Sequence, residues 1–215
     1  MRKRIESIIN NCINCQINKN HTHGKLGLLS GSLHHDTAWE KIAVDLFGPC
    51  DLAHFSTHSE GGKVYILVII DLFTRFVRLQ QLKSPTSAVI IKELETKWFI
   101  RYGRPDQILT DNGVQFTSKE MAEFMNRHKI KHVFISTYNP TANGICERTN
   151  ATIAQILRMN QGKSLTKALS IAETNLNHCT HSTLKTSPYI LAFGRESLDP
   201  REQKRDHTAM PEDTK

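Results

Sequence analysis

The longest unbroken apolar run of the 215-residue chain is Val64-Tyr65-Ile66-Leu67-Val68-Ile69-Ile70. Its β-branched residues, its length and its lack of polar alternation predict a strand that is buried on both faces. The dipeptide Gly61-Gly62 before the run is typical of a turn, and Asp71 ends the run. Because a helix needs about 20 apolar residues to cross a bilayer, this run is too short for a membrane-spanning helix.

Two further strands are predicted on either side of this run. Residues 42–47, Ile-Ala-Val-Asp-Leu-Phe, are almost entirely apolar and are stopped by Gly48-Pro49. Residues 75–80, Arg-Phe-Val-Arg-Leu-Gln, alternate between polar and apolar side chains. The first pattern predicts a buried strand and the second a half-exposed one. Since the three strands follow one another closely, we expect an antiparallel meander.

Helices and strands alternate in the remainder of the chain. The predicted elements are a helix from Ser84-Pro85 to Gly103, a strand at 107–110, a helix opening at Thr117-Ser118, a strand at 132–135, a loop at 140–144, and helices at about 145–159 and 165–178. This order predicts an α/β protein with a ribonuclease H-like fold, a five-stranded mixed sheet flanked by helices. We expect that core at 36–195, a separate segment at 1–35 and a disordered polar tail at 196–215.

The composition is that of a globular protein with a basic surface. Hydrophobic residues make up 39% and charged residues 23%, and 28 Lys and Arg against 21 Asp and Glu give a net charge of +7. A positive chain attracts polyanions such as nucleic acid, although a basic protein without such a ligand has the same composition. Five cysteines, an odd number, argue for a reducing compartment. No apolar segment of signal-peptide length follows the basic N-terminus, so we do not expect secretion.

Three acidic residues occupy positions that suggest chemistry when they are considered together. Taken singly, Asp45 in an apolar strand suits a paired core residue, Asp111 in Asp-Asn-Gly suits a turn, and Glu147 early in a helix suits the helix dipole. On two neighbouring strands and a crossing helix, however, the three carboxylates would converge and repel one another unless a cation lay between them. Magnesium prefers such oxygen ligands, and two ions can clamp both oxygens of a phosphodiester displacement. The set predicts metal-assisted phosphoryl transfer on nucleic acid.

Five segments of the chain, taken in order, form a recognisable sequence pattern. They are 39–49, Trp-Glu-Lys-Ile-Ala-Val-Asp-Leu-Phe-Gly-Pro; 65–71, Tyr-Ile-Leu-Val-Ile-Ile-Asp; 109–116, Leu-Thr-Asp-Asn-Gly-Val-Gln-Phe; 137–148, Thr-Tyr-Asn-Pro-Thr-Ala-Asn-Gly-Ile-Cys-Glu-Arg; and 187–195, Ser-Pro-Tyr-Ile-Leu-Ala-Phe-Gly-Arg. In this order they resemble the catalytic core of retroviral and retrotransposon integrases, most closely those of gypsy-type elements. That family is marked by two Asp and a Glu, with 35 residues between the second and the third. Here 35 residues separate Asp111 from Glu147.

The resemblance implies an activity and a set of catalytic residues. Asp45, Asp111 and Glu147 would be the catalytic residues and the ligands of two magnesium or manganese ions. The implied enzyme is a magnesium-dependent polynucleotidyl transferase and endonuclease, which trims a DNA 3′ end and then joins it to target DNA. Such in-line displacements need no covalent enzyme intermediate. We therefore expect Cys146 to serve packing, and Asp71 to be a structural residue at a strand end.

The same resemblance suggests DNA contacts around Glu147. Asn143 at the helix entry would contact DNA or order the preceding loop, and Gly144 would give that loop mobility. Arg148 would touch a phosphate or orient Glu147, with a plain surface arginine as the alternative. Many relatives have a basic residue where this chain has Ala151, so we expect a weaker grip on DNA along that helix face.

The flanks of the predicted core depart from the family pattern. Relatives have two His and then Cys-x-x-Cys, whereas here no His precedes Cys12 and Cys15, and two His follow them. We therefore expect residues 1–35 to be a truncated zinc-finger-like segment and linker without zinc, with a zinc site at the two cysteines as the alternative. Residues 199–215 are too few and too polar for the further DNA-binding domain or chromodomain of relatives.

Three functional hypotheses remain at this point. The first is an integrase-type transferase core, and the second is a nucleic-acid-binding or scaffold protein derived from such a core, with its chemistry unused. The third is a ribonuclease H, against which the 35-residue spacing argues. As partners we expect DNA, both element ends and target, and further copies of the chain in a homo-oligomer, but no membrane. A nuclear location is expected from the DNA substrate.

Overall fold

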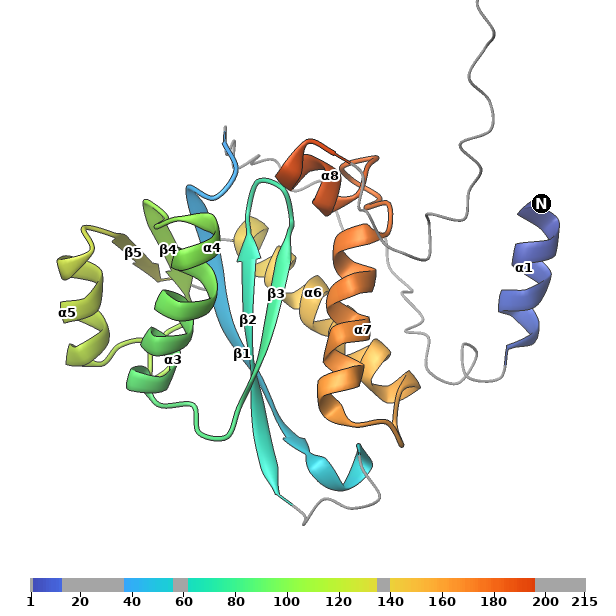
Figure 1. Ribbon diagram of the computed structural model, residues 1–215, viewed down its shortest axis with the longest axis horizontal. Helices are drawn as coiled ribbons and strands as arrows, with labels where there is room; N and C mark the ends of the chain where they lie inside the picture. The colour runs from blue at the N-terminus through green and yellow to red at the C-terminus, as the bar shows by residue number, and fades with distance from the viewer. Residues whose placement is uncertain (1, 13–36, 56–61, 135–139, 196–215) are drawn as a thin grey trace, which may run out of the picture.

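The computed structural model describes residues 2–12, 37–55, 62–134 and 140–195. At its centre lies a five-stranded sheet with the strand order β3-β2-β1-β4-β5 (Figure 1). The strands are β1 (Lys41–Asp51), β2 (Lys63–Asp71), β3 (Val77–Leu82), β4 (Gln107–Thr110) and β5 (Lys131–Phe134). The predicted five strands are thus confirmed, each within a few residues of its expected bounds.

The strands run in both directions, so the sheet is mixed as expected. β1 is antiparallel to β2, and β2 is antiparallel to β3, which confirms the meander. β4 pairs in parallel with β1, and β5 pairs in parallel with β4. β1 continues past its expected end because its pairing with β2 resumes at Cys50 after an irregularity that begins at Phe47. Gly48 lies there with φ +126°, and a Cβ on it would come within 3.2 Å of Val64 O.

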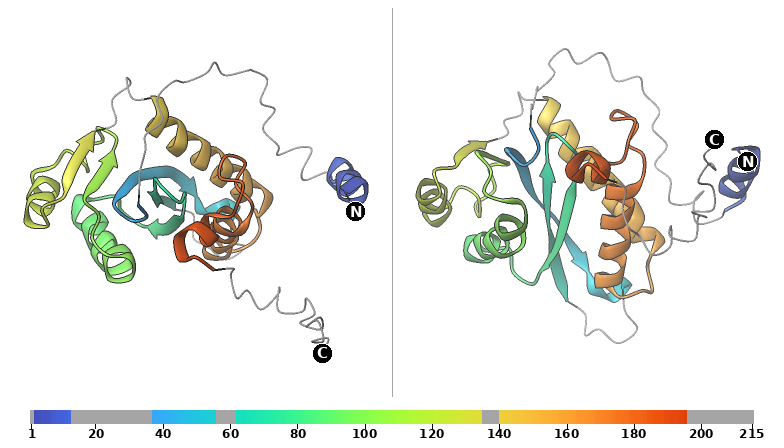
Figure 2. Two further views of the ribbon diagram at one scale, coloured as in Figure 1. Left: turned by 90° about the horizontal axis from the view of Figure 1, so that it is seen from above. Right: turned by 45° about the horizontal axis from the view of Figure 1, so that its top comes forward.

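Helices cover both faces of the sheet (Figure 2). One layer consists of α3 (Ser87–Glu93), the π-helical turn η2 (Leu94–Phe99), α4 (Ile100–Tyr102) and α5 (Lys119–Arg127). The other consists of α6 (Pro140–Met159), α7 (Leu165–His178) and, beside α7, α8 (Pro188–Phe193). A helix near the N-terminus, α1 (Arg2–Asn11), and the short 3-10 turn η1 (Leu52–His54) complete the described elements.

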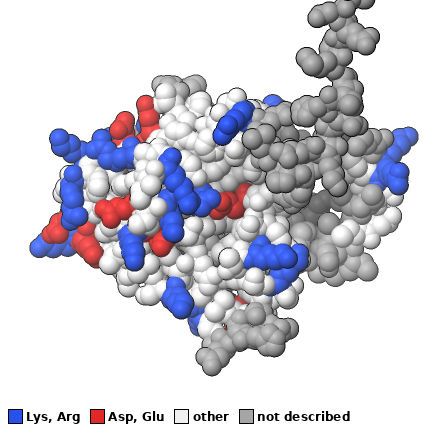
Figure 3. All heavy atoms as spheres, viewed as in Figure 1, with Lys and Arg blue, Asp and Glu red and all other residues white. Residues whose placement is uncertain are grey.

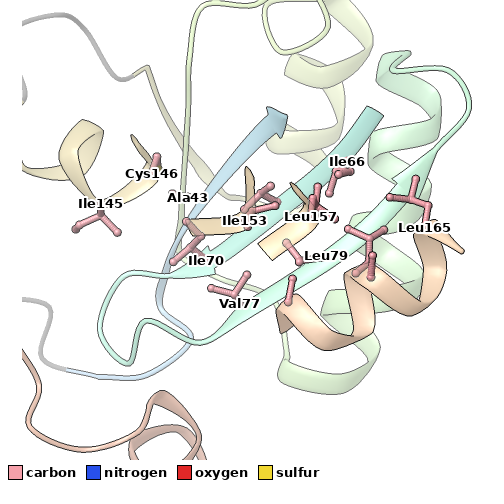
Figure 4. Packing of buried hydrophobic residues seen from close by; sticks show 14 of the residues in the cluster. Ala43, Ile66, Ile70, Val77, Leu79, Ile145, Cys146, Ile153, Leu157 and Leu165 are labelled. Atoms are coloured by element: carbon pink, nitrogen blue, oxygen red, sulfur yellow. The ribbon is translucent and has the colours of Figure 1, made fainter. Parts of the chain in front are cut away.

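Two hydrophobic cores form because β2 contributes side chains to both faces. Ile66, Val68 and Ile70 pack with residues of α6 and α7, as Figure 4 shows for Ile153 and Leu157. Leu67 and Ile69 pack on the opposite face against α3, η2 and α5. This two-sided burial confirms the prediction made for the apolar run at 64–70.

Side chains of α7 bond directly to the backbone of β3. Asn177 accepts a hydrogen bond from Val77 N at 2.8 Å through Oδ1 and donates one to Val77 O at 2.8 Å through Nδ2. One turn earlier, Glu173 accepts from Leu79 N at 2.9 Å and forms an ion pair with Arg78. Burial raises the pKa of Glu173, against the opposing effect of these two partners. The contacts fix α7 alongside β3.

Two of the predicted helix starts are confirmed or nearly so. Ser118 caps α5, since its Oγ accepts a hydrogen bond from Met121 N at 3.2 Å, and α7 has the predicted bounds. The helix expected at Ser84-Pro85 begins later, at Ser87, with Thr86 as its N-cap. Its first backbone hydrogen bond runs from Ile90 N to Thr86 O at 3.0 Å, so Pro85 precedes the helix.

The prediction of a loop at residues 140–144 is wrong. These residues form the first turn and a half of α6, which runs from Pro140 without a break. A proline at the first helical position costs nothing, because its missing N–H has no partner there and its φ angle is already helical. Gly144, expected to lend mobility to that loop, lies within the helix instead.

The short helix α8 was not predicted, although its sequence signals are present. Ser187 caps it, with its Oγ accepting from Ile190 N at 3.2 Å, and Pro188 is its first residue. Gly194 ends it at φ +67°, the left-handed conformation that glycine adopts without strain. The tail expected at 196–215 lies outside the described residues.

Candidate active site

Asp45 lies at the centre of the sheet, on β1, where it is half-buried. Its Oδ1 accepts a hydrogen bond from Leu46 N at 2.8 Å. Its Oδ2 accepts one from Nδ2 of Asn150, on α6, at 2.7 Å. The carboxylate that interrupts an apolar strand thus lies beneath the helix that carries Glu147.

Asp111 directly follows β4, the strand next to β1. The parallel register pairs Ala43 with Leu109, so two residues further along, Asp45 and Asp111 come level with each other. Asp111 is exposed, and its Oδ1 accepts a hydrogen bond from Gly113 N at 3.0 Å. This is the turn geometry expected of Asp-Asn-Gly, and it leaves Oδ2 without a hydrogen bond from the described residues.

Glu147 lies on α6 and its side chain is exposed. Residues three apart on a helix lie on the same side of it, so Glu147 is on the side of α6 from which Asn150 reaches Asp45. The carboxylate is one helical turn nearer the start of α6 than that contact. The three predicted residues therefore come from two adjacent strands and from the helix that crosses one of them.

The described residues do not include a group of three His, Cys, Asp or Glu side chains close enough to hold a metal ion. The donor chemistry nevertheless fits a hard divalent cation, because it offers carboxylate oxygens on adjacent strands. A second observation agrees with this fit: Oδ1 of Asn150, beside Asp45, is buried and has no hydrogen-bond partner among the described residues. A cation at Asp45 would lie next to an acceptor that nothing else satisfies.

Asp71 has a structural role, as expected. It is fully buried at the end of β2. Its Oδ1 accepts from Trp39 N at 2.9 Å, and its Oδ2 accepts from Thr74 N at 2.7 Å and from Thr74 Oγ1 at 2.6 Å. Both carboxylate oxygens thus accept from protein donors, which gives Asp71 a structural role in the turn after β2.

Cys146 is a packing residue, also as expected. It is buried in the core that lies between the sheet and α6 (Figure 4). Burial, with a further contribution from Asp45, raises the pKa of its thiol to about 12. The thiol therefore stays protonated at neutral pH, and a protonated thiol is a poor nucleophile.

The residues predicted to contact DNA begin α6. Asn143 is in the first turn, and its side chain lies outside the described part of the structure. Gly144 faces the Arg148 guanidinium: a Cβ at Gly144 would lie 3.4 Å from Nη1 of Arg148. Arg148 is exposed and lines a cleft beside α6. Contact of these residues with DNA stays a prediction.

The predicted zinc residues are only partly described. Cys12 follows α1 and is half-buried, whereas Cys15 lies outside the described residues. Neither the truncated finger nor the alternative zinc site is therefore tested, and the domain limits of the chain likewise stay predictions.

Asn150 is the site residue that sequence reasoning missed. Its spacing of three residues from Glu147 was a usable signal, because it places an amide on the same helix face as a proposed ligand. The distribution of surface charge does not mark the site in the same way. On the face seen in Figure 3, basic and acidic side chains are interspersed over α3 and α5.

The chain is similar to known proteins over most of its length. Residues 49–140 match the integrase core domain, a range that includes Asp111 but neither Asp45 nor Glu147. Over 193 residues the chain is 25% identical to the Transposon Tf2-3 polyprotein of Schizosaccharomyces pombe. The matched region is 88% of this chain and 14% of the polyprotein. The Tf2-4 polyprotein of the same organism matches to the same extent. The chain thus spans a small part of these relatives.

Solved structures share the fold. A chain of the simian T-cell lymphotropic virus intasome in complex with PP2A regulatory subunit B56 gamma gives a TM-score of 0.60 at 23% identity, over 90% of this chain and 67% of that one. The HTLV-2 integrase catalytic core domain in complex with magnesium, in a trimeric form, gives 0.59 at 23% identity, over 74% and 99%. These matches confirm the ribonuclease H-like fold.

None of the helices in the described part of the chain has the length and apolar character that a membrane crossing needs.

Proposed function

Because this chain carries an integrase core of the retroviral and retrotransposon type, we propose that it is the catalytic core of a polynucleotidyl transferase acting on DNA. It would trim a DNA 3′ end and join that end to target DNA. One observation carries the proposal: Asp45 and Asp111 are level on adjacent strands, and α6, with Glu147, is bonded to Asp45 through Asn150. These contacts support a site in which carboxylates from three separate parts of the sequence act together.

In this proposal the three carboxylates hold divalent cations. Magnesium is the first choice, because all three donors are hard oxygen ligands, and a similar fold was solved with magnesium in the HTLV-2 integrase core. Bound there, two ions supply activation of the attacking oxygen and stabilisation of the leaving oxygen. Manganese, which takes similar ligands, is expected to substitute.

The residues of the chain would have distinct tasks. Asn150 fixes the orientation of the Asp45 carboxylate through its amide hydrogen bond. Glu147, exposed on α6, would supply the third carboxylate. Cys146, with a pKa of about 12, holds its proton. The attacking group is therefore water or a DNA hydroxyl and not a protein thiolate.

Oligomerisation belongs to the proposal as well. The HTLV-2 integrase core was solved in trimeric and dimeric forms, and the simian viral neighbour is part of an intasome. We expect this chain to form at least a dimer on DNA. The other activities of the Tf2 polyproteins are not assigned to it, because the match covers 14% of them. Nuclear location stays a prediction.

A disintegration and strand-transfer assay on labelled branched DNA tests the proposed activity. Wild-type protein, Glu147→Gln and Glu123→Gln are compared in magnesium and in manganese. Glu123 is the matched control, since it is an exposed glutamate on α5, on the opposite face of the sheet, whose only described ion pair is 3.8 Å long. We expect metal-dependent joining by wild type and by Glu123→Gln, and none by Glu147→Gln.

Other outcomes would overturn the proposal in specific ways. A folded wild-type protein that binds DNA but joins nothing in either metal would favour the scaffold hypothesis, with unused chemistry. Equal activity of Glu147→Gln would remove that residue from the site. Cleavage of the RNA strand of a hybrid, without joining of DNA, would favour a ribonuclease H.

A further inference from the structure

A cleft of about 650 Å³ opens on the side of α6 where Arg148 lies. Its walls come from α6, from the turn between β2 and β3, from the end of α7 and from the segment after α7. The polar residues that matter most in it are Arg75, Arg148, Asn175 and His181. Only Arg148 among them was singled out by the sequence.

The cleft carries positive charge without a matching acid. No Asp or Glu is among its described lining residues, and neither arginine forms an ion pair with a described residue. Burial and then the charge of Arg148 lower the pKa of Arg75. Asp71 is not in the cleft lining; its charge raises the pKa of Arg75, a smaller effect than the first two, and its fully buried carboxylate accepts three hydrogen bonds from Trp39 and Thr74. Two guanidinium groups therefore face one space that an anion would fill.

One of the two guanidinium groups, that of Arg75, is held in place before any ligand arrives. Arg75 adopts φ +65° in the turn after β2, and its Nη1 donates a hydrogen bond to Leu72 O. Arg148 lies back over Gly144, where a side chain would crowd it. Each guanidinium has five N–H donors, so both keep donors for a ligand. A positioned donor such as Arg75 loses little freedom when it binds.

His181 adds a neutral donor to the cleft. Its Nδ1 accepts a hydrogen bond from Thr183 N at 3.3 Å, so the proton of the neutral ring lies on Nε2. Burial, with the charges of Arg75 and Arg148, lowers the pKa of His181. The hydroxyls of Thr149 and Thr152 donate to carbonyl oxygens of their own helix and are not available. The charged and amide donors of the cleft are thus two guanidinium groups, an imidazole N–H and the Asn175 amide, beside the hydroxyls of Thr180, Ser182 and Thr183.

We propose that this cleft binds one phosphate of the DNA strand on which the enzyme acts, an inference that rests on the proposed function. Planar guanidinium groups form paired, charge-assisted hydrogen bonds with phosphate oxygens. The cleft borders the helix of the proposed site, because its lining residue Arg148 directly follows Glu147 on α6. Arg75 and His181 thereby become strand-positioning residues that no sequence motif indicates.

The first experiment measures DNA affinity by fluorescence anisotropy over a range of salt concentrations, in EDTA so that no reaction occurs. Arg148→Met is compared with Arg127→Met, which removes the same charge from an exposed position on α5, across the sheet. Loss of a charge-assisted phosphate contact should lower affinity for a single-stranded oligonucleotide about tenfold. It should also reduce the salt slope by about 0.7. Arg127→Met should change the affinity and the salt slope by less than Arg148→Met does.

The second experiment locates the bound strand. Cys179 is exposed and lines the cleft, so its alkylation by iodoacetamide, followed by peptide mass spectrometry, reports occupancy. We expect the oligonucleotide to slow alkylation of Cys179 in wild type and in Arg127→Met, but not in Arg148→Met. Arg75→Gln should behave like Arg148→Met, and Arg148→Met alone suffices if the turn of Arg75 does not tolerate substitution.

Several results would overturn the proposal. Equal affinity losses in Arg148→Met and Arg127→Met would mean that only net charge matters. Unchanged alkylation of Cys179 under saturating DNA would place the strand elsewhere. Protection by inorganic phosphate as strong as that by the oligonucleotide would assign the cleft to a free anion. None of these measurements needs turnover, so the two proposals can fail separately. The protein can join DNA without binding a strand in the cleft, and it can bind a strand there without joining DNA.

Discussion

Asn150 on α6 donates a hydrogen bond of 2.7 Å from its Nδ2 to Oδ2 of Asp45 on β1, joining residues 105 positions apart in the sequence. The other amide atom of Asn150, Oδ1, is buried without a partner among the described residues. A buried acceptor in this state costs free energy that the fold must offset. Its place beside a carboxylate of the proposed metal site suggests that the cost is accepted for function.

Asn150→Ala should therefore impair activity more than stability. Without the amide, the Asp45 carboxylate loses its fixed orientation, and residues that orient metal ligands typically contribute about 10- to 100-fold in activity or metal affinity. We expect joining to fall by that order and the magnesium concentration for half-maximal rate to rise. A variant with wild-type magnesium dependence would show that the amide serves packing only.

Magnesium should stabilise the folded protein through the same carboxylates. The register of β1 and β4 brings Asp45 level with Asp111, which directly follows β4, and a cation held by both carboxylates would favour the folded state. A ligand at a hundred times its Kd adds about 2.7 kcal/mol to the free energy of unfolding, equivalent to several degrees in Tm. Scanning fluorimetry should show this shift for wild type and Glu123→Gln. A shift of equal size in Asp111→Asn would place the ion elsewhere.

Cys146→Ala should leave joining within about twofold of the wild-type rate. The thiol is buried and its pKa is about 12, so no thiolate is available for chemistry. Loss of the sulfur from a packed core should lower the free energy of unfolding by about 1 kcal/mol, measured by urea denaturation. An inactive but folded Cys146→Ala protein would contradict the assignment of this residue to packing.

Stability should decline in mild acid, in part because of His132. Burial lowers the pKa of this residue from its ordinary 6.5, and its Nε2 lies 2.8 Å from Thr110 Oγ1. The unfolded chain then binds the proton more readily than the folded protein. The contribution is complete above pH 6.5 and is lost as the pH falls through the lower folded value. The urea midpoint should drop less on acidification in His132→Gln than in wild type, and an identical drop in both would rule out this residue as a cause.

The sheet could be predicted because its signals are local and strong. A run such as 64–70 has no plausible place outside a buried strand, and the structure buries it on both faces. The start of α6 could not be predicted from the sequence, because Pro140 and Gly144 are typical of loops when only their neighbours are considered. In the structure, helical backbone geometry at Pro140 and packing of Ile145 and Ile153 against the sheet decide the outcome.

The candidate site shows the same division. The spacing of Asp111 and Glu147 and the position of Asp45 were visible in the sequence, since each lies at a recognisable point of an element. The role of Asn150 depends on how α6 crosses β1, and the cleft at Arg75 and His181 depends on three segments meeting in space. Contacts of that kind are set by tertiary packing, which no local pattern encodes.

The bonds from α7 to β3 have a consequence for assembly. β3 is the outermost strand of the sheet on its side, and Asn177 and Glu173 occupy the backbone groups of Val77 and Leu79 that a further strand would need. An open edge invites strand addition from another chain, and here one edge is already closed by side chains. A strand from another copy would therefore have to displace these α7 contacts to pair with the first half of β3, whereas no α7 side chain is described on the outer edge at β5.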